Sequence, residues 1–286
     1  MTVSEEVAPS KRGQVFHLVI RPTGGWRSLD LREVWRYRGL LAAMTKRDIT
    51  LRYRQTALGV IWVVLQPLLA AGILTFVFSN VVGFDSPGVP YIVFAYTGVL
   101  GYNAFASTLT FMSTCLVTNA GLVSKVYFPR IILPLSQIGS KLVDFAVGLG
   151  LYVVLNLAFG VGFHLSMLTL PLWMALAYGM ALGLGLLTSA ANVSYRDVGF
   201  IVPVVLPLIL YLAPVAYPVE EVPDNLRAAY DLNPLVGMIN GFRWCLLGRG
   251  GLELGGTVYA VVFTVLMIVG GTLYFRAHER RFADVI

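Results

Sequence analysis

Four basic side chains stand immediately before a long uncharged segment, and their chemistry suits the binding of phosphate. They are Lys46, Arg47, Arg52 and Arg54, and no Asp, Glu, Lys or Arg occurs from Gln55 to Phe84. Guanidinium and ammonium groups form charge-assisted hydrogen bonds to phosphate oxygens. Basic residues beside an apolar segment also anchor a protein at the cytoplasmic face and attract anionic phospholipid. The pattern supports both interpretations, and the two are compatible.

The composition indicates an integral membrane protein. Hydrophobic residues make up 57% of the 286 residues and charged residues 13%, whereas a soluble domain carries about 25% charged residues. Small residues at four-residue spacing (Ala175, Gly179 and Gly183) favour close packing of helices. Six segments have the roughly 20 apolar residues that a membrane-spanning helix needs: about 57–82, 91–117, 135–160, 169–193, 199–217 and 255–275. We therefore predict an all-α integral membrane protein with six transmembrane helices in a domain over residues 55–276.

The fifth predicted span is the shortest of the six and is rich in proline. It contains Pro203, Pro207 and Pro214. Proline inside a helix removes a backbone hydrogen bond and kinks the helix unless neighbouring groups compensate. The pattern is compatible with an ordinary membrane helix or with a broken, mobile helix beside a transport pathway.

Lys and Arg fall mostly on one side of the predicted spans. With the N-terminus in the cytoplasm, 18 of the 21 basic residues lie inside, and three lie outside, namely Arg227, Arg243 and Arg249. Because positive charge is retained on the cytoplasmic side, we predict that both termini are cytoplasmic. The first 20 residues lack the apolar core of a signal peptide, so insertion is expected to use internal segments.

The four basic residues belong to a predicted amphipathic helix over residues 28–54, which follows a cytoplasmic tail over residues 1–27. Asp30 and Glu33 form a capping box at its start. Its apolar face comprises Val34, Tyr37, Leu41 and Met44, and its basic face comprises Arg32, Arg36, Lys46 and Arg47. A helix of this kind lies in the cytoplasmic interface of a membrane.

Two further segments outside the spans carry structural signals. The cytoplasmic connection over residues 119–134 has room for a short helix at about 120–128, and it is either a docking element or a solvated turn. On the outer side, residues 218–250 contain Asn233-Pro234, a typical helix start. The apolar stretch that follows, Leu235–Leu247, is too short to span a membrane. We predict a re-entrant or interfacial helical hairpin between spans five and six, and a cytoplasmic tail over residues 277–286.

The sequence lacks the residue patterns of an enzyme. Lys141 and Asp144 lie one turn apart near the start of the third span, where we expect them to pair. Paired carboxylates, an HExxH motif, a nucleophile with a base and a G-x-x-x-x-G-K-[ST] phosphate loop are all absent. No Cys or His spacing is typical of metal ligands. We therefore predict no catalytic residue, metal or cofactor in this chain, and any driving energy must come from another chain.

Five motifs, in this order, carry a resemblance to a known family: "WRYRGLL", "KRDITLRYRQTALGVIWVVLQPLL", "GVPYIVFAYTGVLGYNAF", "SKVYFPRIILPLSQIGSKLVDF" and "SYRDVGFIVPVVLPLILYLAPVAYP". Together they resemble the membrane subunit of polysaccharide-exporting ABC transporters. These are the O-antigen, capsule and teichoic-acid export permeases of the ABC-2 membrane family. The resemblance covers about residues 25–280 and leaves residues 1–24 unexplained.

The resemblance implies a transport subunit with partners. Family members are six-span subunits of the bacterial cytoplasmic (inner) membrane that pair as homodimers above two copies of a cytoplasmic ABC ATPase, which binds ATP and Mg²⁺. The implied cargo is a glycan on polyprenyl diphosphate, whose headgroup Lys46, Arg47, Arg52 and Arg54 would bind. Membrane lipids are further partners, and nucleic acid is not. The implied ATPase contacts in the connection over residues 119–134 are Leu122, Lys125, Val126, Tyr127, Phe128 and Arg130.

Aromatic side chains are candidates for a sugar pathway, because aromatic rings stack weakly on the C–H faces of sugars. The candidates are Trp62, Phe94, Tyr96, Tyr102, Phe105 and Tyr211. Three other functions stay open: an ABC-2 permease for another lipid or a drug, a membrane-embedded lipid or glycosyl transferase, and a passive scaffold. The glycan itself is not specified by any motif.

Overall fold

The chain divides into two compact units, Met1–Asp30 and Leu31–Ile286. The computed structural model describes residues 2–5, 18–21, 31–53, 61–86, 88–249, 251–279 and 281–282. In the first unit, β1 (Thr2–Glu5) and β2 (Leu18–Arg21) pair in antiparallel register. The all-α prediction missed these strands, although Val19 and Ile20 favour extended backbone.

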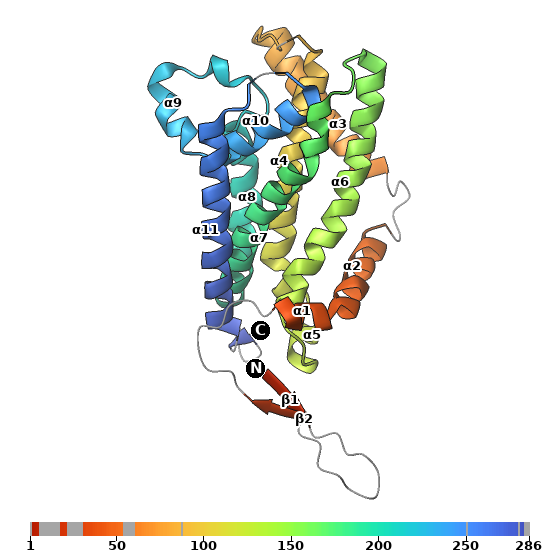
Figure 1. The fold of residues 1–286 in the computed structure, drawn as a ribbon, viewed down its shortest axis with the longest axis vertical. Coiled ribbons are helices and arrows are strands. Elements are labelled where there is room, and N and C mark those ends of the chain that lie inside the picture. Colours follow the sequence, from red (N-terminus) through yellow and green to blue (C-terminus); the bar gives the residue numbers. More distant parts are fainter. Residues whose placement is uncertain are drawn as a thin grey trace, which may run out of the picture. The chain divides into compact units, whose positions relative to one another are not determined.

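Long helices dominate the second unit (Figure 1). Five helical segments are long and apolar enough to cross a membrane: Ile61–Val81, Tyr91–Thr118, Ile132–Phe159, Leu165–Ser194 and Leu254–Glu279. They comprise α3 (Ile61–Thr75) with the π-helix η1 (Phe76–Val81), α4 (Tyr91–Thr118), α6 (Ile132–Phe159), the 3₁₀-helix η2 (Leu165–Thr169) with α7 (Leu170–Ser194), and α11 (Leu254–Glu279). Within the described residues, they confirm five of the predicted spans.

The remaining predicted span is shorter than expected. Helix α8 (Val198–Tyr211) has 14 residues, which is about 21 Å of helix against a hydrocarbon core of about 30 Å. It contains Pro203 and Pro207, and the chain after Tyr211 continues in turns. The predicted span over 199–217 is therefore a short apolar helix followed by a turn segment, 212–217.

Helix α4 forms the centre of the bundle. Most of its residues are buried, and it packs against α3, α6, α7, α8 and α10 (Pro234–Leu247). In contrast, α3 buries Ala71 and Leu74 and exposes much of its apolar surface. A helix that is apolar on all sides is typical of a protein core or of a membrane span. Helix α4 is buried by its own chain, whereas the apolar surface of α3 is left uncovered by the part of the chain that the structure describes.

Glycines allow α11 to contact its neighbours closely. A Cβ on Gly271 would lie 2.1 Å from the carbonyl oxygen of Gly183 in α7, and a Cβ on Gly237 of α10 would lie 2.1 Å from the carbonyl oxygen of Gly256. A Cβ on Gly179 would lie 3.1 Å from Thr264. The close packing predicted for Gly179 and Gly183 is thus confirmed, and the partner is α11.

We expect Gly271→Ala to destabilise the protein by about 1–3 kcal/mol, because the added methyl group overlaps backbone of α7 and the two helices must separate. The measurement is the thermal unfolding midpoint of the purified protein in detergent. The matched control is Gly270→Ala on the same helix, since a Cβ there meets nothing within 4 Å. Equal midpoints for the two variants would contradict the close contact between α7 and α11.

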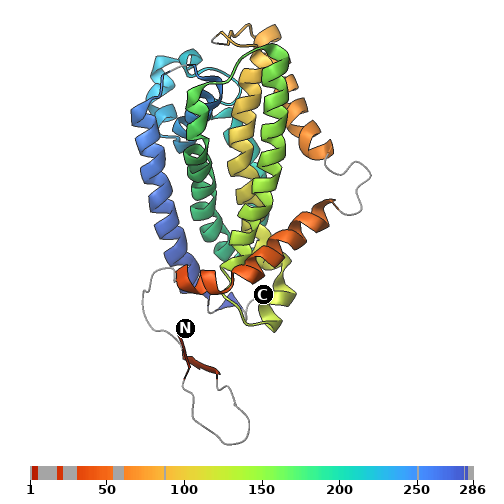
Figure 2. The same cartoon turned by 45° about the vertical axis from the view of Figure 1, so that its right-hand side comes forward.

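The short elements gather at the two ends of the long helices (Figures 1 and 2). One end holds α1 (Leu31–Arg36), the start of α2 (Arg38–Tyr53), and α5 (Ala120–Lys125). The other end holds η3 (Val219–Glu221), α9 (Asp224–Asp231) and α10 (Pro234–Leu247). The arrangement separates the two connections that the sequence singled out.

Two of these elements follow the sequence signals closely, and one does not. The helix expected at about 120–128 is α5, which ends because Val126 is extended. At the start of α10, the side chain of Asn233 accepts a hydrogen bond from the Leu235 amide at 3.1 Å. The single helix predicted over 28–54 is instead two helices, α1 and α2, separated by a turn at Tyr37.

Candidate functional site

The basic helix α2 is attached to the first half of α6 by a row of polar contacts, which we call the α2–α6 seam. It comprises Thr45, Asp48 and Arg52 on α2 and Ser136, Gln137, Lys141 and Asp144 on α6. Residues 45, 48 and 52 recur at helical spacing and therefore share one face. The structure thus places α2 against the bundle through a polar face.

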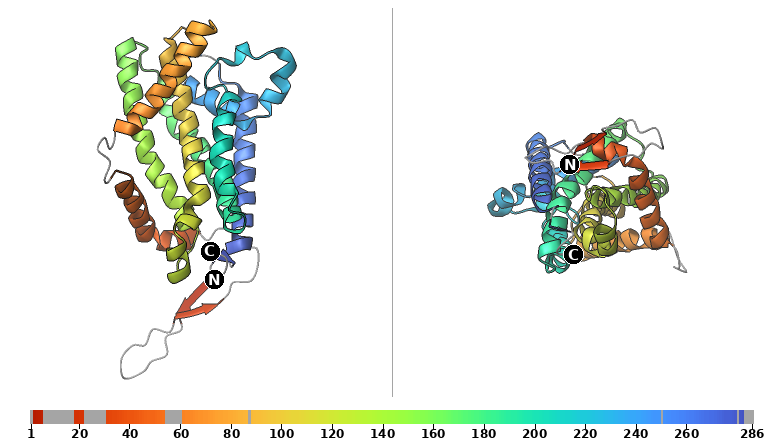
Figure 3. Two further views of the ribbon diagram at one scale, coloured as in Figure 1. Left: turned by 180° about the vertical axis from the view of Figure 1, so that it is seen from behind. Right: turned by 90° about the horizontal axis from the view of Figure 1, so that it is seen from below.

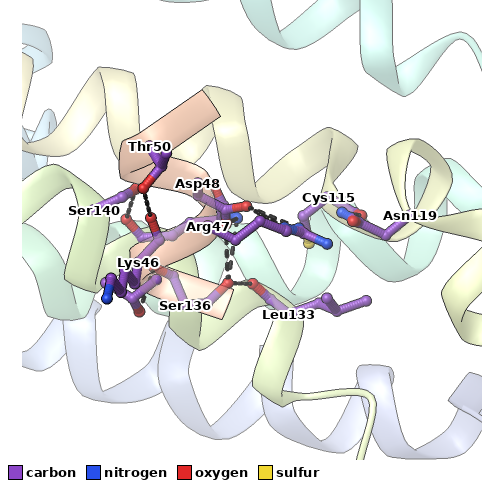
Figure 4. A network of polar contacts seen from close by, with 11 residues as sticks. Lys46, Arg47, Asp48, Thr50, Cys115, Asn119, Leu133, Ser136 and Ser140 are labelled. Carbon is purple, nitrogen blue, oxygen red and sulfur yellow. Dashed lines mark hydrogen bonds and ion pairs between the residues drawn. The ribbon is translucent and has the colours of Figure 1, made fainter. Parts of the chain in front are cut away.

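Close packing and hydrogen bonds fix the first part of the seam. The Thr45 hydroxyl donates to the Ser136 carbonyl oxygen at 3.3 Å. A Cβ on Gly139 would lie 2.7 Å from the Thr45 side chain, so glycine is needed for this approach. The Asp48 carboxylate accepts a hydrogen bond from the side-chain amide of Gln137 at 2.7 Å and one from the Ser136 hydroxyl at 3.4 Å. Asp48 also accepts from Arg47 at 2.8 Å, and Figure 4 shows Arg47 and Asp48 of α2 beside Ser136 of α6.

The second part of the seam joins two cations to one carboxylate. Oδ2 of Asp144 accepts hydrogen bonds from the guanidinium of Arg52 and from Nζ of Lys141, the latter at 3.2 Å. Nζ of Lys141 lies 3.5 Å from the ring centroid of Phe111 in α4, and the Arg52 guanidinium lies 5.4 Å from it. The predicted pairing of Lys141 with Asp144 is confirmed, and Arg52 joins it from α2.

The four predicted headgroup residues therefore have different surroundings. Lys46 is exposed, and Arg47 is ion-paired to Asp48. Arg52 is ion-paired to Asp144. Arg54 lies outside the described residues. The role of these four residues in headgroup binding stays a prediction. The ion pairs that Arg47 and Arg52 form with Asp48 and Asp144 were not predicted from the sequence.

The predicted pathway aromatics fall into two groups. Phe94, Tyr96, Tyr102 and Phe105 of α4 are buried in the core, and the Tyr96 hydroxyl donates to the Gly148 carbonyl oxygen at 2.8 Å. The Tyr102 hydroxyl donates to the Leu206 carbonyl oxygen of α8. These hydroxyls join α4 to α6 and α8, so they contribute to packing within the chain.

The other two aromatics lie at the surface. Trp62 of α3 and Tyr211 of α8 are exposed. Both helices lie on the side turned toward the viewer in the left-hand view of Figure 3. A pathway role stays a prediction for all six residues, and these two are the ones that this chain leaves accessible.

The predicted coupling residues form an exposed tip on a fixed base. Val126 and Tyr127 are 52% and 53% exposed, and Lys125 is also exposed. Phe128 is buried, and Leu122 is partly buried. The Arg130 amide donates to the Glu279 carboxylate at 3.2 Å, and its guanidinium donates to the Glu279 carbonyl oxygen. The tip is therefore tied to the end of α11.

Sequence reasoning missed a buried arginine at the opposite end. Arg243 of α10 is 6% exposed, and its guanidinium lies 3.7 Å from the ring centroid of Phe94. It donates to the carbonyl oxygens of Val215 at 2.7 Å and Tyr217 at 3.4 Å. It therefore fastens the turn after α8 to α4 and α10. The available signal was an arginine inside the otherwise apolar stretch Leu235–Leu247.

A second missed residue connects three helices. Nδ2 of Asn192 in α7 donates to the Ser113 carbonyl oxygen of α4 at 2.9 Å, and its Oδ1 accepts from the Gly199 amide of α8 at 3.1 Å. Asn192 is buried, where polar side chains are normally hydrogen-bonded. A lone asparagine in an apolar run was the signal.

The fold and these contacts define a polytopic helical membrane protein with a basic helix and an exposed tip at the same end. No group of three or more His, Cys, Asp or Glu side chains suited to a metal occurs within the part of the chain that the structure describes. The sequence model of the ABC-2 type transporter family matches residues 39–247. The chain belongs to this family, and it is an ABC transporter permease.

Curated relatives cover nearly the whole chain. An O-antigen export system permease protein RfbA from Myxococcus xanthus is 26% identical over 90% of this chain and 98% of its own length. A protein of the same name from Klebsiella pneumoniae is 29% identical over 86% of this chain and 95% of its own length. The polysialic acid transport protein KpsM of Escherichia coli is 23% identical over 83% and 92%. The resemblance read from the five motifs is thus confirmed.

Proposed function

We propose that this chain is the membrane subunit of an ATP-driven exporter that moves a polyprenyl-diphosphate-linked polysaccharide out of the cytoplasm. The observation that carries the proposal is the match to polysaccharide-export permeases over 92–98% of their own lengths. The cargo would be an O-antigen, capsule, teichoic acid or related glycan. The chain would act in the cytoplasmic (inner) membrane with both termini in the cytoplasm.

Partners follow from what the chain itself lacks. Because its sequence contains no phosphate-binding loop, ATP hydrolysis would take place in two copies of a separate cytoplasmic ABC ATPase. These would dock at the tip around Val126 and Tyr127. A homodimer with six spans in each protomer would enclose the pathway, with α8 and the turn segment 212–217 together as the fifth span, and α9 and α10 would form the outer hairpin.

The cargo has a charged headgroup and a polar sugar chain, and the protein has surface groups suited to each. A diphosphate headgroup requires cations on the cytoplasmic side, and α2 carries Lys46, Arg47 and Arg52 at the end of the bundle that we assign to that side. Charge-assisted hydrogen bonds give phosphate binding both strength and orientation. A polysaccharide chain requires a passage that binds weakly, and exposed rings such as Trp62 and Tyr211 would provide it at a protomer interface.

Deleting this chain is expected to trap a lipid-linked glycan inside the cell and to remove the corresponding polysaccharide from the surface. The measurement combines surface staining for polysaccharide with extraction of cytoplasmic-face lipids and mass analysis of their sugars. Expression of the intact chain should restore export. Normal surface polysaccharide in the deletion strain, together with accumulation of a sugar-free lipid or a drug, would favour the other cargo classes.

A further inference from the structure

We propose that Arg52 and Lys141 form a binding site for the phosphate group of a lipid, and that Asp144 takes the place of that phosphate in the present structure. This inference rests on the proposed function, because it assigns the headgroup contact of the cargo to particular residues. Lys141 was outside the set predicted from sequence. The class of ligand is a phosphate or diphosphate attached to an apolar chain.

Charge is the first argument. Arg52 and Lys141 both bond to Oδ2 of Asp144, so this carboxylate faces two cations that carry one more charge than it can neutralise. The ring of Phe111 lies against both cations and contributes its π face, which carries no net charge. A phosphate or diphosphate offers more oxygens and more negative charge than a carboxylate, and it could bond to both cations together.

Access is the second argument. The side chain of Arg52 is 35% exposed, and that of Asp144 is 16% exposed. The Lys141 side chain is 1% exposed beneath them. An anion arriving from the surface would therefore meet Arg52 first. It would reach Lys141 once the Asp144 carboxylate turned away.

The surroundings fit an amphiphilic ligand. The ring of Phe111 lies against both cations and is 45% exposed. This exposed aromatic surface beside the charged cluster would accommodate the first part of a lipid chain while its phosphate bonds to the cations. This combination points to a lipid phosphate in preference to a free anion.

The first part of the seam explains why the site could open without releasing α2. Thr45 and Asp48 bond to Ser136 and Gln137 independently of Asp144. Asp48 also forms an ion pair with Arg47 and accepts hydrogen bonds from other side chains of the seam. The carboxylate that pairs with Arg52 is instead shared with a second cation, so Arg52 is the better candidate to exchange this carboxylate for a phosphate.

Opposite effects of two substitutions test the site. With the intact chain in phosphatidylcholine nanodiscs, farnesyl diphosphate is the probe, and its dissociation constant is measured by thermophoresis. Arg52→Gln should weaken binding about tenfold or more, because a charge-assisted contact is lost. Asp144→Asn should tighten binding by a similar factor, because the internal competitor loses its charge. Arg36→Gln on α1 removes an equal charge elsewhere and should leave the dissociation constant unchanged.

A structural role for the ion pair makes a different prediction. If Asp144 only holds α2 against α6, Asp144→Asn should weaken probe binding as Arg52→Gln does, and the proposal is wrong. Should Arg52→Gln not fold, Arg52→Lys keeps the charge without the planar fork and should bind with intermediate affinity. Absence of probe binding to the unaltered chain would also overturn the proposal.

Inorganic diphosphate and phosphatidylglycerol distinguish the sources of the phosphate. Tighter binding of farnesyl diphosphate than of either supports a prenyl diphosphate as the ligand. Equal binding of phosphatidylglycerol, with the same opposite responses to the two substitutions, supports the site with phospholipid as its ligand. The binding test is independent of export. If the cell exports the glycan but neither substitution changes the dissociation constant of the probe, the proposed site is wrong and the proposed function still stands.

Discussion

Replacing Val126 and Tyr127 together by aspartate is expected to release the ATPase subunit and to stop export. The two side chains are exposed and directly follow α5, which lies at the end of the bundle opposite α9 and α10. Anchors at the centre of a protein–protein interface typically contribute about 2 kcal/mol or more each, or about thirtyfold in affinity. Their base would stay intact, because Phe128 is buried and Arg130 is bound to Glu279.

The measurement is copurification of the ATPase with the tagged chain, combined with surface polysaccharide. Leu165→Asp is the control, since Leu165 in η2 is also an exposed apolar residue and lies outside the tip. The control should retain the ATPase. Stoichiometric ATPase on the double variant would show that the docking surface lies elsewhere.

Arg243→Ala is expected to destabilise the protein by about 2–5 kcal/mol. The substitution leaves the buried carbonyl oxygen of Val215 and the part-buried one of Tyr217 without this donor, and the loss at a buried acceptor has a free-energy cost of about 1–3 kcal/mol. It also leaves a cavity over Phe94, which adds to the loss. Arg243→Lys keeps a charge but lacks the fork that reaches both oxygens, so its effect should be intermediate.

Thermal unfolding of the purified variants checks this expectation. Arg227→Ala on α9 provides the comparison, because partly exposed surface residues usually change stability by less than about 0.5 kcal/mol. An Arg243→Ala protein as stable as the Arg227→Ala protein would mean that the turn after α8 is held by other contacts.

Local sequence signals predicted the helices well, because each signal acts within one segment. Long apolar runs indicated α3, α4, α6, α7 and α11, and Asn233 with Pro234 marked the start of α10. The length of α8 was overestimated because apolar residues continue past its end into the turn at 212–217. That turn depends on Arg243, which comes from a distant part of the chain.

The candidate site was predictable only in part, because its geometry depends on pairs far apart in sequence. The cations of α2 and the pair Lys141 and Asp144 were both recognised, but nothing local connects Arg52 with Asp144, 92 residues away. The aromatics of α4 show a related limit. A helix that is apolar on every side does not reveal which of its rings faces a pathway and which is buried against α6 or α8.

Helix α11 links the two ends of the molecule mechanically. Its last residue, Glu279, bonds to Arg130 at the base of the exposed tip, and its first turn contacts α10 backbone to backbone at Gly256 and Gly237. Between these points it is locked to α7 at Gly183 and Gly271. A displacement of the tip would therefore act on the end of α11, and α7 and α10, which contact α11 through their backbones, would have to move with it.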